Sequence, residues 1–203
     1  MGVNGPGLVG QPTLAGVKIA RFLAFWQTNG QQIVLVQLTG AGVTTANDQA
    51  LIVFQSSAAL NQPLVLLREG DIAPGCPGAT IGVINRVDVS SYWGQYAVLA
   101  TLNGAAKGTE LALFRGASSK VVTASTQVLR RPVLVLRKGF LFDNQPSKVK
   151  SITLPANLLP ASGAGTTGLG SAIQETSGIT QAGKIALVID FENGVRQIMN
   201  GIP

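Results

Sequence analysis

One short phrase occurs three times along this chain, and this internal repeat limits the possible fold more than any single residue does. Each copy consists of a glycine, two mostly polar residues, a run of alternating β-forming residues and a closing glycine turn. The copies open at Gly30, Gly94 and Gly183 and close at Gly40, Gly104 and Gly194. An internal repeat indicates one supersecondary unit that packs against copies of itself. We therefore expect these glycines to be structural.

A second phrase repeats at the end of each of the first two units. Residues 63–70 read PLVLLREG and residues 132–139 read PVLVLRKG. The aliphatic run predicts a buried strand, and the glycine that follows it predicts the turn that ends the strand. Arg68 and Arg137 occupy matching positions in the two phrases. We expect them to share a structural role.

The composition favours an all-β protein. Among 203 residues, 46% are hydrophobic, only 12% are charged, and 25 are glycine. A helical bundle needs more charged residues at helical spacing, whereas short strands with tight turns need glycine and β-branched residues. We expect four antiparallel strands per unit, which is typical of a β-propeller and would give about two and a half blades. A β-sandwich or a barrel is the alternative.

These patterns divide the chain into five segments. Residues 1–16 are expected to be an irregular lead-in, residues 17–78 the first repeat and residues 79–139 the second. Residues 140–170 are rich in Gly, Ser and Pro and are predicted to be a loop or linker. Residues 171–203 are expected to be an incomplete third repeat. Because propellers typically need about 4–8 blades, we expect either a homo-oligomer or further repeats of a longer chain.

The chain contains no histidine and a single cysteine, Cys76. This excludes Ser-His-Asp and Cys-His catalysis, metal sites built on imidazole or thiolate clusters, and an intrachain disulfide. Cys76 is expected to be a passive thiol in a turn. Hydrolysis by paired carboxylates would need distant acidic residues to meet in space, and the candidates are Asp88, Glu110, Asp190 and Glu192. We expect that the protein is not an enzyme.

The densest polar cluster follows the first aliphatic strand. Glu69 and Asp71 offer carboxylate oxygens of the kind that bind Ca²⁺. The alternative is structural: Arg68 pairs with a carboxylate, and Asp71 caps the turn. The matching position of Arg137 favours this structural role. No other cofactor is indicated.

Positive charge is concentrated between residues 107 and 150, where nine basic residues stand against two acidic ones. A basic surface attracts acidic polysaccharide. The residues predicted to bind it are Lys120, Arg130, Arg131, Lys148 and Lys150. The alternative is a solvated strand face whose charges prevent aggregation at sheet edges. Few aromatic residues accompany the charges, which argues against nucleic acid as a partner.

The second copy of the repeated phrase resembles the NxxGxxAFxAxLxG signature of the bacterial choice-of-anchor tandem repeat family. The matching residues are Gly94, Ala97, Ala100, Leu102 and Gly104. Residues 68–75, which read REGDIAPG, are similar to another phrase of that family. The first Asn of the signature is replaced in the three copies, and the second unit has Phe140 where the family phrase has Asp.

The resemblance covers residues 20–140 well and residues 172–200 weakly. It implies a β-propeller-like, exported protein at the cell surface. We expect such a protein to act as a non-enzymatic scaffold or interaction module that self-assembles. The resemblance supplies no catalytic residue. A lectin-like module for acidic polysaccharide is the alternative function. Neither a leader nor an anchor is visible, and no run approaches the roughly 18–20 apolar residues of a membrane-spanning helix.

Overall fold

The computed structural model describes residues 16–28, 31–55, 64–90, 94–118, 120–123, 126–129, 132–154 and 185–202. Within these ranges all regular structure is antiparallel β-strand, and no helix occurs. The prediction of an all-β protein with antiparallel sheets is therefore confirmed. The same ranges hold no helix of the length and apolarity that a membrane span requires.

The strands form three sheets and one separate hairpin. The first sheet contains β1 (Val17–Thr28), β2 (Gln31–Gly40), β3 (Gln49–Gln55) and β4 (Leu64–Arg68). The second contains β5 (Thr80–Val89), β6 (Gln95–Asn103), β7 (Leu111–Ala117) and β10 (Val133–Arg137). The third contains β11 (Val149–Thr153), β12 (Ile185–Phe191) and β13 (Arg196–Ile202). The hairpin of β8 (Lys120–Thr123) and β9 (Thr126–Leu129) lies between β7 and β10 in the sequence.

The first two sheets share irregularities as well as strand order. Their first strands, β1 and β5, each shift register twice against the neighbouring strand. Their fourth strands, β4 and β10, each shift register once, which leaves Leu66 and Val135 without a direct partner. Bulges of this kind bend a strand and increase its twist. The two repeats therefore match in the details of their backbone.

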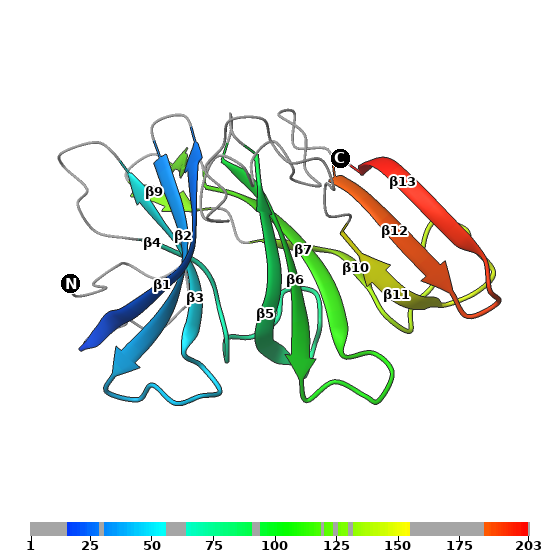
Figure 1. The fold of residues 1–203 in the computed structure, drawn as a ribbon, viewed down its shortest axis with the longest axis horizontal. Coiled ribbons are helices and arrows are strands. Elements are labelled where there is room, and N and C mark those ends of the chain that lie inside the picture. The colour runs from blue at the N-terminus through cyan, green and yellow to red at the C-terminus, as the bar shows by residue number, and fades with distance from the viewer. Residues whose placement is uncertain are drawn as a thin grey trace.

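The three sheets stack face to face, with the second sheet between the other two (Figure 1). One hydrophobic core joins the first sheet to the second and includes Leu51 and Phe114. Another joins the second sheet to the third and includes Leu113, Leu187 and Phe191. Phe114 and Leu113 are neighbours on β7, whose side chains point alternately to the two faces of the sheet. The second sheet is therefore buried on both faces.

The prediction of a loop or linker over residues 140–170 is wrong in part. Within this tract, residues Val149–Thr153 form β11, the first strand of the third sheet. β11 pairs with β12, so the third unit begins before residue 171, where the sequence analysis placed its start. The rest of the tract from residue 155, together with residues 171–184, lies outside the described residues. The described strands form open sheets, and no closed barrel occurs among them.

Candidate functional site

The most distinctive polar feature of the structure is an arginine that closes each of the first two sheets. Arg68 is the last residue of β4, and its Nε donates a hydrogen bond of 3.1 Å to the carbonyl oxygen of Asn47. Arg137 is the last residue of β10, and its Nε donates one of 2.9 Å to the carbonyl oxygen of Thr109. Both acceptors lie in the loop that joins the second strand of a sheet to the third. We call these two contacts the arginine clamps.

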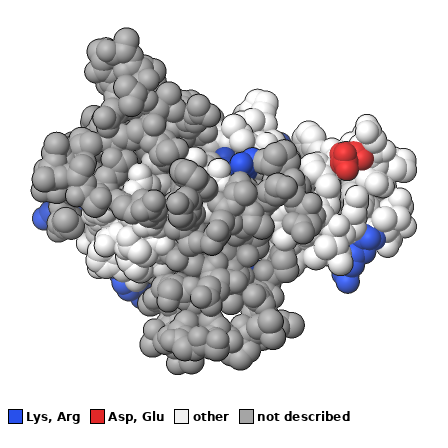
Figure 2. Space-filling model, turned by 90° about the horizontal axis from the view of Figure 1, so that it is seen from above, with Lys and Arg blue, Asp and Glu red and all other residues white. Residues whose placement is uncertain are grey.

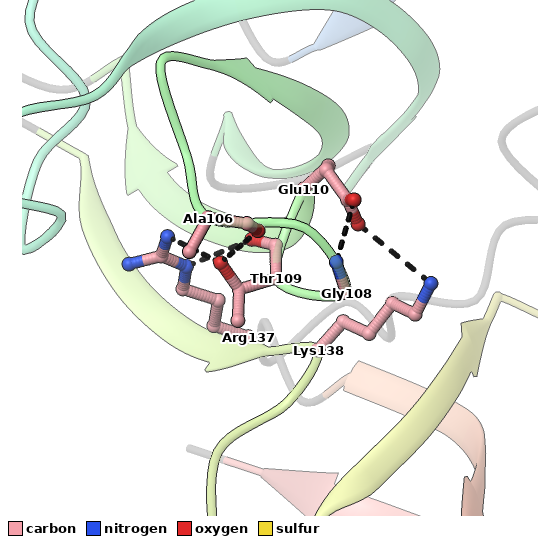
Figure 3. A network of polar contacts seen from close by, with 6 residues as sticks. All are labelled: Ala106, Gly108, Thr109, Glu110, Arg137 and Lys138. Carbon is pink, nitrogen blue, oxygen red and sulfur yellow. Dashed lines mark hydrogen bonds and ion pairs between the residues drawn. The ribbon is translucent and has the colours of Figure 1, made fainter.

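The second clamp is part of a larger network (Figure 3). Arg137 Nη2 also donates to Thr109 Oγ1 at 2.9 Å, and that hydroxyl donates to the carbonyl oxygen of Ala106 at 2.7 Å. The guanidinium carbon lies 4.9 Å from the centre of the Phe140 ring, a distance at which the positive charge is attracted to the aromatic face. One side chain therefore fixes both the loop and the residues that follow β10.

Two residues after each arginine stands a glycine that other residue types could not replace without strain. Gly70 and Gly139 have φ angles of +86° and +80°, a region that other residues rarely adopt. A Cβ atom at Gly70 would lie 2.8 Å from the Cβ of Asn47, and one at Gly139 would lie 2.7 Å from the Cγ2 of Thr109. The glycine thus lets the turn approach the same loop residue that the arginine holds. This explains why the repeated phrase requires both residue types.

Backbone hydrogen bonds continue from each clamp into the next sheet. Gly70 N donates to the carbonyl of Ile81 at 2.7 Å, and Gly139 N donates to the carbonyl of Val149 at 2.7 Å. In return, Ile81 N donates to the carbonyl of Asp71, and Val149 N to that of Phe140. Ile81 lies on β5 and Val149 on β11, so the turn after each clamp also holds the first strand of the following sheet. These hydrogen bonds fix the position of each following sheet relative to the one before it.

The residue directly after each arginine differs in charge. Glu69 is buried, with 3% of its surface exposed, and its Oε2 accepts a hydrogen bond of 3.3 Å from Gln49 N. Burial, helped by the nearby negative charge of Asp48, raises the pKa of Glu69 above its usual value. Asp48 Oδ2 in turn accepts a hydrogen bond of 2.8 Å from Gln37 Nε2.

In the second sheet the equivalent residue is a lysine. Lys138 Nζ lies 3.7 Å from Glu110 Oε2, and both side chains are partly exposed. Glu110 Oε1 also accepts a hydrogen bond of 2.6 Å from Gly108 N. This backbone hydrogen bond, together with the ammonium of Lys138, lowers the pKa of Glu110. Both turns therefore contain the arginine and the glycine, but the residue between these two is acidic in the first sheet and basic in the second.

The predicted calcium ligands Glu69 and Asp71 both lie in the turn after β4. The Glu69 carboxylate accepts from Gln49 N, while the backbone carbonyl of Asp71 accepts from Ile81 N. In the part of the chain that the structure describes, no three or more acidic, cysteine or histidine side chains are grouped so as to hold a metal ion. Calcium binding stays a prediction.

The predicted polysaccharide-binding residues are only partly placed. Lys148 and Lys150 are exposed at the start of β11, whereas Arg130, Arg131 and the side chain of Lys120 lie outside the described residues. Two further members of the basic segment, Arg137 and Lys138, are engaged in the second clamp. In Figure 2 the basic side chains visible among the described residues lie in separate places.

The structural glycines fall largely where the repeat predicts them. Gly40, Gly104 and Gly194 lie at the end of the second strand or in the turn after it, each with a positive φ angle. Gly94 precedes β6 directly and also has a positive φ angle. Gly30 and Gly183 lie outside the described residues.

Sequence reasoning missed the polar contacts that join neighbouring sheets. Ser118 Oγ, after β7, donates to Gln31 Oε1 at the start of β2. Arg86 forms an ion pair of 3.1 Å with the buried carboxylate of Asp88 and donates to the carbonyl of Leu154 at 2.6 Å. These contacts connect the first sheet to the second and the second to the residue after β11. In the contacts between sheets, the partners (Ser118 with Gln31, and Arg86 with Leu154) lie far apart in the sequence and share no motif.

Three of the four carboxylates proposed for catalysis, Asp88, Glu110 and Asp190, form ion pairs with basic residues. Asp88 pairs with Arg86, and Glu110 with Lys138. Asp190 on β12 pairs with Arg196 at 2.6 Å and accepts a hydrogen bond from Ser151, which together lower its pKa. Cys76 is buried, and this burial raises the pKa of its thiol.

A scan against models of protein families finds no match, and searches among curated proteins and among solved structures find no similar protein. What the chain does must therefore be inferred from its own geometry.

Proposed function

We propose that this chain is a non-enzymatic repeat scaffold of an exported or cell-surface protein, in which stacked sheets form a rigid frame for interactions. The observation that carries the proposal is the recurrence of the arginine clamp. In two successive sheets, an arginine at the same position holds a loop of its own sheet, and the backbone of the turn that follows it pairs with the first strand of the next. Contacts that recur in this way serve the stacking of repeats, whose stability depends on the interfaces between neighbours.

The distribution of buried polar groups supports the same function. Ser118 with Gln31, and Arg86 with the carbonyl of Leu154, link neighbouring sheets. A buried polar group costs free energy unless it is hydrogen-bonded. Ser118 has 0% of its surface exposed, and its contact with Gln31 satisfies this buried hydroxyl and fixes how the first two sheets stack. A frame of this kind leaves its loops and outer faces as the surfaces available to a partner.

The propeller-like arrangement belongs to this proposal. Consecutive antiparallel sheets that stack face to face, each entered from the fourth strand of the one before, are typical of neighbouring propeller blades. The first two sheets have four strands and the described third sheet has three. Further sheets, from another copy or from additional repeats, would extend the stack.

Limited proteolysis followed by mass spectrometry tests the scaffold function. A protease-resistant core that contains all three sheets is expected, with early cleavage confined to segments between strands. The variants Arg68→Ala and Arg137→Ala should speed up cleavage in the loops at residues 41–48 and 104–110, because each loop loses the side chain that holds it. Digestion that proceeds uniformly through the sheets of the unmutated chain would count against the proposal.

Acidic polysaccharide remains the alternative partner, favoured by the exposure of Lys148, directly before the edge strand β11, and of Lys150 on that strand. Retention on heparin resin at low ionic strength, lost in a Lys148→Ala/Lys150→Ala double variant, would support it. Elution of the unmutated chain without any added salt would dismiss it.

A further inference from the structure

The second and third strands of every sheet pair in the same register. Leu35 lies opposite Leu51 in the first sheet, and Leu99 lies opposite Leu113 in the second. In the third sheet the corresponding pair is Val188 and Ile198. The correspondence follows from the repeated phrase, in which each of these second-strand residues stands five positions after the opening glycine. Leu51, Leu113 and Ile198 are therefore equivalent residues on equivalent faces.

These three equivalent residues differ sharply in exposure. Leu51 and Leu113 each have 0% of their surface exposed, whereas Ile198 has 78% exposed. Leu51 belongs to the core shared with the second sheet, and Leu113 to the core shared with the third. Ile198 occupies the position at which the other two sheets receive their neighbour. A face that is covered in two repeats is thus open in the third.

We define the outer face of the third sheet by the residues that share this side of β12 and β13. They are Ala186, Val188, Asp190, Arg196 and Ile198. Its centre is aliphatic, and its charged residues form the ion pair of 2.6 Å between Asp190 and Arg196. Since that pair satisfies its own charges, the face is suited to contact with another protein surface of the same kind.

The far face of the first sheet, at the opposite end of the stack, indicates which surface of a second copy can pack on this outer face. Head-to-tail stacking of two copies would place the far face of the first sheet against the outer face of the third. That far face is already covered, because Val36, Ala50 and Ile52 each have 0% of their surface exposed. Among the contacts that two copies could form through the ends of their stacks, the remaining one joins two identical outer faces. A contact of this type is isologous and closes into a twofold dimer.

We propose that the outer face of the third sheet is a homodimer interface, in which two copies of this chain pack Val188 and Ile198 against each other. The twofold axis lets the Asp190–Arg196 pair of one copy lie beside that of the other, so that acidic and basic groups alternate across the interface. The dimer continues the sheet stacking from one chain into the next. This inference rests on the proposed scaffold function and names its partner as a second copy.

Light scattering on a sizing column, over a wide range of protein concentration, tests the interface. The unmutated chain is expected to be a dimer that dissociates on dilution. Ile198→Lys should raise the dimer dissociation constant by about a hundredfold or more, because two lysines would enter the interface of each dimer. Ile72→Lys is the matched control, since Ile72 is 81% exposed in the turn after β4 and is expected to leave the dimer unchanged.

Three results would overturn the interface. One is a monomer at the highest concentration; another is a mass that grows without limit, as head-to-tail stacking would produce; the third is an Ile198→Lys variant that dimerises as well as the unmutated chain. At a protein concentration low enough for both to be monomeric, the two lysine variants should unfold at the same denaturant concentration, which establishes that any loss of dimer is local. A monomer with a protease-resistant core would refute the interface and leave the scaffold function intact. A chain without such a core would refute the scaffold function itself.

Discussion

Replacement of Arg137 by alanine tests the arginine clamp most directly. The substitution removes the hydrogen bonds of 2.9 Å to the carbonyl oxygen and to the hydroxyl of Thr109. It also removes the cation that lies over the Phe140 ring at 4.9 Å. The loop at residues 104–110 and the turn after β10 would both lose the side chain that connects them. We therefore expect a loss of global stability as well as a local change.

The size of this loss can be worked out from the contacts. A hydrogen bond from a charged donor contributes about 1.5–3 kcal/mol, and a cation–π contact at an exposed site about 0.5–1 kcal/mol. Arg137 is only half-buried, so water replaces part of what the alanine variant loses. We expect the free energy of unfolding to fall by about 2–3 kcal/mol, which is less than the sum of these contributions. For a chain of this size that corresponds to a melting temperature lower by about 4–12 °C.

The assay is unfolding in guanidinium chloride, in which the midpoint should fall while the slope stays constant. Lys138→Ala is the matched control, because Lys138 is the next residue along the chain and its ion pair with Glu110 is exposed to water at both ends. The control should leave the midpoint nearly unchanged. Arg137→Lys should fall between the two, since an ammonium keeps the charge but cannot form both contacts with Thr109. Equal midpoints for Arg137→Ala and Lys138→Ala would refute the reasoning.

The remaining predictions concern the turns and the thiol. Because the pKa of Glu69 is raised above 4.5 in the folded chain, the fold gains stability from this group at low pH and loses it as the pH rises through the raised value. Glu69→Gln should therefore raise the free energy of unfolding near about pH 7 and have little effect near about pH 3; a gain that is equal at both would contradict the assignment. Gly139→Ala should lower the unfolding midpoint more than Gly78→Ala, because both glycines have positive φ angles but only Gly139 faces a neighbouring side chain at 2.7 Å. Cys76, with 1% of its surface exposed, should react with a thiol reagent only when the chain unfolds, and rapid reaction of the folded chain would show that the turn opens.

The repeated phrase predicts much of the fold, because its alternation is a local property of the sequence. Residues 31–40 and 95–103 form strands where the phrase places them. β11 was missed because its two buried residues, Val149 and Ile152, are three positions apart. The register shift between Val149 and Ser151 brings both to the same face, and this breaks the spacing of two that identifies a strand. A bulge of this kind depends on the partner strand and leaves no mark in the sequence.

Only one half of each contact in the candidate site could be predicted from the sequence. The matched phrases predict a shared structural role for Arg68 and Arg137, but the acceptors of their hydrogen bonds are backbone carbonyls of Asn47 and Thr109. A carbonyl is present at every residue, so no side-chain pattern indicates which one is used. The count of basic residues between 107 and 150 likewise gave no sign that Arg137 is taken up by a structural contact.

The difference between the two clamps bears on what the first turn requires. In the second sheet, the ammonium of Lys138 stands beside the carboxylate of Glu110. In the first, Glu69 takes the place of that lysine and stands beside the carboxylate of Asp48, which is the like-charge contact that helps to raise its pKa. A proton on Glu69 would remove that repulsion, as the positive charge of Lys138 does in the second turn. Since the second turn forms the same backbone hydrogen bonds with a lysine at this position, the conformation of the turn does not depend on a carboxylate there. The arginine and the glycine define the repeat, and the residue between them sets only how its stability responds to pH.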